Sequence, residues 1–278
     1  MPSRLWAACA ALALFVGTGL TAATTSFPVD ELKPGMVGIG RTVFEGDRLD
    51  DFKVHILGVL RNVIGTHRNL ILARLEGGPL AETGVIAGMS GSPVYIDGRL
   101  VGAVSYSMGQ FSKEPIAGIT PIDEMIQDTA LDAGRRVERQ VNLTVPVTTE
   151  GLRQSLRESF AWARPFADNP ADIQVFGAGI DPGVGSMMRP IATPLTIGGF
   201  NASVIDPIAS SFREQGFIPV MAAQAPAPSI ATPGVAARLR PGDPVGVSLI
   251  RGDLDFSATG TVTEVDGDRV YAFGHPFF

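Results

Sequence analysis

Length, composition and charge set the first limits on this chain. It has 278 residues, a formal net charge of −6 and one cysteine, Cys9. A chain with this charge has no evident basic face, so nucleic acid is a poor candidate partner. A single cysteine excludes a disulfide within the chain and a cysteine-rich metal site. The 33 glycines and 21 prolines, set between short aliphatic runs, favour a fold that is mainly β.

The first two dozen residues have the three-part layout of a secretory signal peptide. Arg4 gives a positive start, Leu5 to Leu20 is apolar or small, and Thr21-Ala22-Ala23 offers small residues for cleavage. The apolar run is shorter than the ~20 residues that span a bilayer, which favours a cleaved signal over a membrane anchor. We expect residues 1–23 to be removed. The remaining chain is then exported to the periplasm or extracellular space, without a stable membrane span and without a cysteine.

Runs of strand length fill the region after the signal. They are rich in β-forming and apolar residues and comprise Val37 to Val43, Phe52 to Leu60, Leu70 to Leu75, Val94 to Ile96, Leu100 to Ser107 and Ile116 to Ile119. Asp97-Gly98 predicts a tight hairpin turn between the fourth and fifth runs. Short strands at this spacing indicate a barrel or a sandwich. Pro121 to Asp132 then predicts a helix, because apolar residues recur at helical spacing behind a first-turn proline.

The pattern changes after this helix. In chain order we expect a charged link at Gly134 to Gln140, a helix at Thr149 to Trp162, a loop at Pro182 to Pro194, a strand within Leu195 to Val204, a short helix within Ile205 to Gln215 and a low-complexity linker at Ala222 to Pro233. Strands return at Val245 to Arg251, Phe256 to Val265 and Arg269 to Phe273, the last two joined by an Asp266-Gly267 turn. The expected domains after the signal are 24–133, 134–235 and 236–278.

One loop has the composition that a serine nucleophile needs. Gly88-Met89-Ser90-Gly91-Ser92-Pro93 lies between two predicted strands. Flanking glycines tolerate positive φ and leave room for a substrate, so a serine between them can be presented on a tight turn. Backbone N–H groups beside it can then face the oxygen that becomes negative during attack. A structural turn is the alternative, since Gly, Ser and Pro are ordinary turn residues.

Three histidines are available as the base that a serine requires. His275 follows a predicted strand and stands between glycine and proline, a setting that can orient a side chain. His67 lies in a polar loop, and His55 lies inside a predicted strand. On these local grounds His275 ranks first, His67 second and His55 last.

Several motifs, taken in order, carry a family resemblance. They are Lys33-Pro34-Gly35, Leu49-Asp50-Asp51-Phe52, Glu82-Thr83-Gly84-Val85-Ile86, the serine loop, Leu100-Val101-Gly102-Ala103-Val104 and, far along the chain, Gly260-Thr261-Val262-Thr263 and Tyr271-Ala272-Phe273-Gly274-His275. In this order they resemble the stage IV sporulation protein B (SpoIVB) serine peptidase family, which is similar to chymotrypsin-like peptidases. In the sporulation peptidase the histidine segment precedes the serine segment, whereas here it follows.

The resemblance implies roles for particular residues. Ser90 would be the nucleophile and His275 the general base, with the backbone N–H groups of Gly88 and Ser90 as the oxyanion hole. Glu76 is the nearest counterpart of the family's acidic residue, and Glu82 is the alternative. The implied fold is mainly β: a chymotrypsin-like β-barrel bearing the serine, then a mixed α/β region and a partial second β-barrel bearing His275.

The implied function is that of an exported serine endopeptidase that cleaves protein segments in the cell envelope, or itself. The alternative is an inactive peptidase-fold module that serves as an envelope binding or scaffold protein. No cofactor and no metal are expected, and the expected partner is a protein or peptide substrate. The substrate, the oligomeric state, the role of residues 140–235 and whether the chain is complete after Phe278 stay open at this point.

Overall fold

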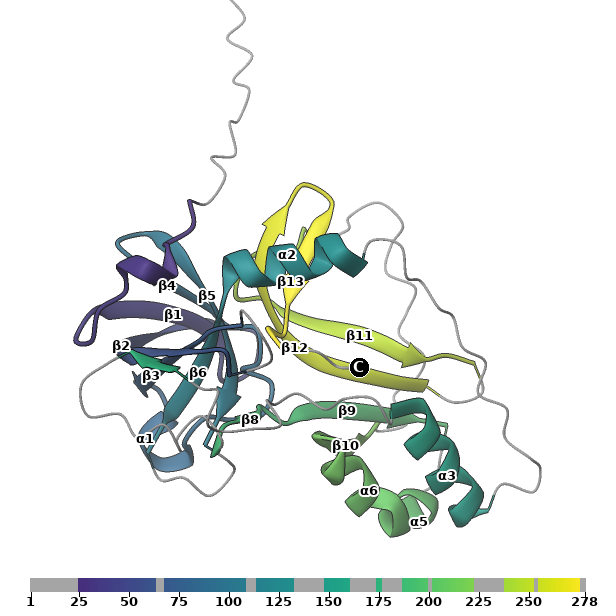
Figure 1. The fold of residues 1–278 in the computed structure, drawn as a ribbon. Coiled ribbons are helices and arrows are strands. Elements are labelled where there is room, and N and C mark those ends of the chain that lie inside the picture. The colour runs from purple at the N-terminus through teal and green to yellow at the C-terminus, as the bar shows by residue number, and fades with distance from the viewer. Residues whose placement is uncertain are drawn as a thin grey trace, which may run out of the picture.

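The computed structural model describes residues 25–63, 68–108, 114–132, 148–160, 174–176, 187–199, 202–222, 238–252 and 255–275. The predicted signal at 1–23, the link at Gly134 to Gln140, His67 and nearly all of the linker at Ala222 to Pro233 lie outside these ranges. Figure 1 shows two β-structures side by side, one built from the first half of the chain and one from the second. Among the described residues, no helix is both long enough and apolar enough to cross a membrane.

The first β-structure is a closed antiparallel barrel. Its strands are β1 (Val37–Val43), β2 (Leu49–Arg61), β3 (Leu70–Glu76), β4 (Pro93–Ile96), β5 (Arg99–Ser107) and β6 (Ile116–Pro121). They follow the order β1-β4-β5-β6-β3-β2, and pairing of β1 with β2 closes the ring. Closure leaves no sheet edge open over the paired length. The predicted barrel in the serine-bearing half is therefore confirmed, as are its predicted strands, with ends shifted by a few residues.

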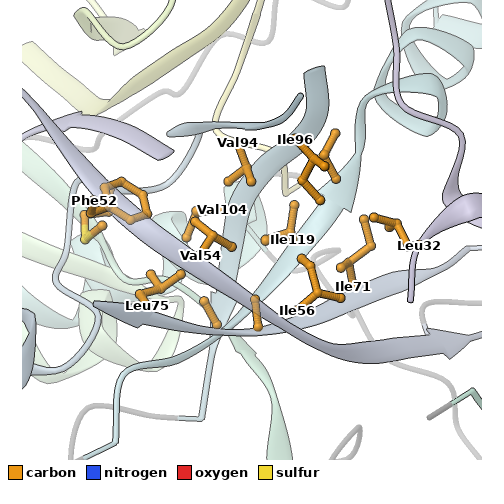
Figure 2. Packing of buried hydrophobic residues seen from close by; sticks show 14 of the residues in the cluster. Leu32, Phe52, Val54, Ile56, Ile71, Leu75, Val94, Ile96, Val104 and Ile119 are labelled. Carbon is orange, nitrogen blue, oxygen red and sulfur yellow. The ribbon is translucent and has the colours of Figure 1, made fainter. Parts of the chain in front are cut away.

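The alternation of apolar and polar residues along a strand places the apolar side chains inside this barrel. Along β2 the buried residues Phe52, Val54 and Ile56 are separated by the exposed Lys53 and the partly exposed His55, as the two-residue period of a strand requires. Figure 2 shows such side chains from several strands pointing into one interior. Each fully buried Val, Leu or Ile contributes about 1.5–3 kcal/mol, so this core is the main stabilising element of the first half.

The second β-structure is an open five-stranded sheet. Its strands are β9 (Thr193–Gly198), β10 (Phe217–Met221), β11 (Pro244–Ile250), β12 (Asp255–Asp266) and β13 (Arg269–Ala272). The order is β10-β9-β12-β11, and β13 pairs with the far part of β12. A second apolar cluster, which includes Leu195, Phe212 and Phe256, packs against it. The predicted mixed region and partial second β-structure are confirmed. Strands from both 134–235 and 236–278 share this sheet, and the domain division itself stays a prediction.

Short elements complete the fold. They are η1 (Val29–Glu31), α1 (Leu80–Thr83), α2 (Ile122–Asp132), α3 (Thr149–Phe160), β7 (Gln174–Phe176), β8 (Arg189–Pro190), α5 (Ala202–Ile205), η3 (Asp206–Ile208) and α6 (Ala209–Glu214). The helices predicted at 121–132, 149–162 and 205–215 are confirmed in outline. In Figure 1, α2 lies above the junction of the two β-structures.

One prediction in the middle region is wrong. The loop expected at Pro182 to Pro194 contains β8, which pairs with β5, and it also contains the start of β9. The strand expected within Leu195 to Val204 is confirmed as the later part of β9, which ends at Gly198, and a helix begins at Ala202. Prolines at 190 and 194 concealed β8 and the start of β9, because proline lacks the N–H that a ladder uses and is common in loops.

Candidate active site

The serine loop has the tight geometry that its glycines predict. Gly88 and Gly91 have φ angles of +92° and +98°, in the region that favours glycine. The N–H of Gly91 donates to the carbonyl of Val104 at 2.8 Å, and the N–H of Ser92 donates to the carbonyl of Met89 at 2.9 Å. The loop is therefore folded onto β5 with Ser90 at its turn.

Ser90 and His275, which are 185 residues apart in the sequence, are in hydrogen-bond contact. The Oγ of Ser90 lies 2.7 Å from the Nε2 of His275. Ser90 is 0% exposed and His275 is 9% exposed. The structure thus brings together the two residues that the resemblance pairs as nucleophile and base, at the separation this chemistry requires.

A backbone carbonyl also accepts a hydrogen bond from the serine hydroxyl. The Oγ of Ser90 donates to the carbonyl oxygen of Phe273 at 2.9 Å. Phe273 has a φ of +67°, and the N–H of Gly274 donates to the carbonyl of Ala272 at 2.8 Å, which makes a γ-turn centred on Phe273. A bulky residue in this conformation is strained, and such strain gathers at functional sites. The turn directs the Phe273 carbonyl at Ser90 and places His275, two residues further along, within hydrogen-bond distance of the same hydroxyl.

Strand β12 fixes the serine loop from the other side. The hydroxyl of Thr261 donates to the carbonyl of Gly88 at 2.9 Å, and the N–H of Thr261 donates to the carbonyl of Ser90 at 2.8 Å. The buried hydroxyl of Thr263 donates to the carbonyl of Gly91 at 2.7 Å. Three carbonyls of one short loop are thereby held against one strand, which sets the orientation of the loop's peptide groups.

The resemblance assigns the N–H groups of Gly88 and Ser90 to an oxyanion hole. In the described part of the chain, neither has a hydrogen-bond acceptor. The carbonyl of Met89 accepts from Ser92, so the N–H of Ser90, on the opposite side of the same trans peptide, faces away from Ser92. N–H groups that are free of other acceptors beside the nucleophile are what an oxyanion hole requires.

Glu76, the predicted acidic residue, lies away from the Ser90–His275 pair. Its carboxylate accepts from Nε2 of His55 at 2.8 Å and from Nζ of Lys53 at 3.5 Å, on the outer wall of the barrel. The hydrogen bond from His55, with the charge of Lys53, lowers the pKa of Glu76. The structure does not bring Glu76 to the Ser90–His275 pair. The alternative, Glu82, has an exposed side chain in α1.

Sequence reasoning missed two contributors to the site: the Phe273 carbonyl and the β12 threonines. The threonines had a signal, since they stand in the Gly260-Thr261-Val262-Thr263 motif that carries part of the family resemblance. The Phe273 carbonyl had none, because a backbone oxygen leaves no mark in a sequence. In the part of the chain that the structure describes, no three His, Cys, Asp or Glu side chains are grouped as metal ligands would be.

Comparison with known proteins gives one family match, and it lies in the first half of the chain. Residues 23–126, which hold the barrel and the serine loop, match the model of the SpoIVB peptidase S55 family, so the resemblance is confirmed over that segment. None of the curated proteins compared matches the chain. A solved structure of the HtrA-type protease AlgW with a decapeptide is similar at 17% identity and a TM-score of 0.31. That likeness covers 87% of this chain and 65% of the other, and at this score it supports no conclusion.

The barrel, its serine loop and the family match over residues 23–126 support a serine peptidase-type fold for this part of the chain.

Proposed function

We propose that this chain is an exported serine endopeptidase that cleaves protein segments in the cell envelope or segments of itself. The observation that carries the proposal is the 2.7 Å contact between Ser90 Oγ and His275 Nε2. The layout of residues 1–23 supports export, and the family match supports peptide-bond hydrolysis as the reaction.

The proposed reaction has two halves. His275 takes the proton of Ser90 as the oxygen attacks the peptide carbonyl, and the carbonyl oxygen becomes negative between the N–H groups of Gly88 and Ser90. His275 then gives the proton to the departing amine, which leaves an acyl group on Ser90. Water attacks this ester with His275 again taking a proton, and the acid product leaves while the proton returns to Ser90.

A scaffold or binding role is the second candidate, and the complete burial of Ser90 favours it. A nucleophile that is 0% exposed and donates to the Phe273 carbonyl is not presented to solvent in this conformation. In that case the peptidase fold would serve as an envelope module without turnover.

A fluorophosphonate probe separates the two candidates, because it reacts with activated serines. We expect the full chain to be labelled on Ser90, as located by mass spectrometry. Ser90→Ala should abolish labelling, and His275→Gln should slow it by about 10²–10⁴-fold, the usual contribution of a general base.

Two matched controls accompany these variants. Ser92→Ala alters the neighbouring buried serine, whose hydroxyl has no hydrogen-bond partner among the described residues, and should leave labelling intact. Glu76→Gln should change the rate by less than about twofold, because exposed ion pairs contribute little. Absence of labelling in the folded wild type, or equal labelling in Ser90→Ala, would favour the scaffold role.

A further inference from the structure

One edge of β5 is shared by three segments in succession. Strand β4 pairs with its first half, up to Ala103. The serine loop follows, with Gly91 and Ser92 both bonded to Val104. Strand β8 then takes the end of the edge, where Pro190 pairs with Tyr106 and Arg189 pairs with Ser107. The segment that contains β8 therefore runs directly past the loop that presents Ser90.

A bulge in β5 allows the backbone of this last stretch to pair with the segment that contains β8. The pairing of β5 with β6 shifts register between Val104 and Tyr106, which leaves Ser105 outside the ladder. The hydroxyl of Ser105 accepts from the N–H of Thr120 at 3.2 Å, and the carbonyl of Ser105 accepts from the N–H of Ile191 at 2.9 Å. Bulges of this kind redirect backbone groups beside functional sites. Here the bulge turns a carbonyl toward a passing chain, next to the nucleophile.

The segment Met188–Pro194, called the strap below, is firmly seated on this edge. Met188 and Ile191 are 0% and 2% exposed, and Ile191 belongs to the same apolar cluster as Met89 of the serine loop. At the other end of the strap, Pro194 Cγ lies 3.8 Å from the position that a Cβ on Gly88 would take. The strap thus runs along the end of β5 and reaches the Gly88 end of the serine loop.

We propose that the strap is an intramolecular competitor of the substrate, because it occupies the edge of β5 from Ser105 to Ser107, where the proposed function would place an extended peptide beside Ser90. An added strand gains main-chain hydrogen bonds from an exposed edge and specificity from alternate side-chain pockets. The site fits a peptide whose N–H bonds to Ser105 and whose apolar side chain takes the place of Ile191. The inference rests on the proposed function, since it makes strap release a condition for substrate to reach Ser90.

A reversible disulfide tests whether the strap must move. Ser107 and Arg189 are antiparallel partners, and such partners have Cα atoms about 4.5–5.5 Å apart, within the range that a disulfide spans. Neither residue contacts the Ser90–His275 pair in the proposed mechanism. The test protein is the full chain with Ser107→Cys, Arg189→Cys and Cys9→Ser. We expect fluorophosphonate labelling of Ser90 to be at least about tenfold slower in the oxidised form than after reduction.

The controls fix the meaning of each outcome. The single variants Ser107→Cys and Arg189→Cys, each with Cys9→Ser, should label at one rate whether or not reductant is present. Ile191→Ala, which loosens the strap, should label faster than wild type by about tenfold or more, with its fold checked by circular dichroism. Equal labelling of the oxidised and reduced double variant, with the disulfide verified by mass, would overturn the proposal.

A binding measurement separates failure of the strap from failure of the proposed function. If wild-type Ser90 is never labelled, the peptidase proposal fails and the strap is judged by fluorescence anisotropy. The probe is a fluorescein-labelled Met-Arg-Pro-Ile-Ala-Thr-Pro peptide, the sequence of the strap itself. It should bind the reduced double variant or Ile191→Ala and not the oxidised double variant. No binding to any form, or equal binding to all, would show that this edge takes no peptide.

Discussion

A serine hydroxyl has one proton, and Ser90 has two acceptors for it. When the proton goes to the Phe273 carbonyl, the 2.7 Å contact with His275 requires Nε2 to donate, and that tautomer is not a base toward Ser90. When the hydroxyl instead donates its hydrogen bond to Nε2, His275 can accept the proton, and the Phe273 carbonyl no longer has Ser90 as its donor. The position of a single proton therefore separates a resting pair from a reactive one.

Glu76 shows the limit of reasoning from distance along a sequence. Its place upstream of Ser90 matched the family's acidic residue, yet strand pairing decides where a side chain points. Lys53 pairs with Glu76 across β2 and β3, so His55 and Glu76 meet on the outer wall of the barrel. His275, in contrast, was predicted from a local setting of strand end, glycine and proline, and the structure places it against Ser90.

Glu124 gives a pH prediction at the same scale. It lies in α2, half-buried, and accepts hydrogen bonds from the backbone N–H and the side chain of Asn69. Burial raises the pKa of Glu124 to about 7, despite the opposing effect of these bonds. The folded chain therefore binds more protons than the unfolded chain between pH 4.5 and 7. Stability from this group is complete below the unfolded pKa of 4.5 and is lost as pH rises through about 7.

Glu124→Gln removes this titration while keeping an acceptor for Asn69. From pH 5 to pH 8 we expect the wild type to lose about 1–2 kcal/mol of unfolding free energy relative to the glutamine variant, a figure reduced for the partial exposure of the group. Urea unfolding of both proteins at each pH measures the difference. A wild type that gains stability relative to the variant over this range would contradict the assignment.

At the scale of elements, local patterns explain which strands could be predicted. Strand β2 alternates buried apolar and exposed or partly exposed polar residues from Asp51 to Ile56, and such alternation is visible in the sequence. Strands β8 and β10 were not predicted. Strand β8 pairs with β5 across more than 80 residues of chain, and β10 pairs with β9. Their own sequences show little alternation of apolar and polar residues. Pairing with a distant strand is a tertiary effect that a short window of sequence does not contain.

Strand β12 acts as the support of the serine loop, and Thr263 tests this role. Thr263→Val keeps the shape of the side chain and removes the hydroxyl that donates to the Gly91 carbonyl, which leaves a buried acceptor unsatisfied. We expect a loss of about 1–3 kcal/mol in stability and slower labelling of Ser90. Thr263→Ser restores the donor and should restore the labelling rate.

The comparison between these two variants distinguishes positioning from packing. Thr263→Val loses the hydroxyl and Thr263→Ser loses the methyl group, so only the valine variant lacks the hydrogen bond to the loop. Labelling that follows the hydroxyl, slow in Thr263→Val and near the wild-type rate in Thr263→Ser, supports a positioning role. Equal labelling rates in both variants would assign Thr263 to packing alone.

At the scale of the whole molecule, the candidate site exists only where the barrel meets the second sheet. Ser90 comes from the barrel, and His275 follows β13 of the second sheet. An apolar cluster across the junction includes Leu100 of β5, Ile122 and Met125 of α2, and Tyr271 of β13. Helix α2 therefore packs on both β-structures and helps to hold the nucleophile and the base in register. In Figure 1 it lies at their junction. Neither β-structure alone contains the pair.

The two β-structures lie in close contact at Gly91, which makes Gly91→Ala a sharp test of this junction. A Cβ there would lie 1.9 Å from the Thr261 carbonyl oxygen and 2.5 Å from the Phe273 nitrogen, both backbone atoms that cannot rotate aside. Gly98→Ala is the matched control, because Gly98 also has positive φ, +74°, but has open space around it. We expect Gly91→Ala to cost about 2–4 kcal/mol more than Gly98→Ala in urea unfolding and to abolish labelling of Ser90, since β12 and β13 must move away with His275. If the two variants were equally stable and equally labelled, β12 would not support the serine loop in the way the contacts indicate.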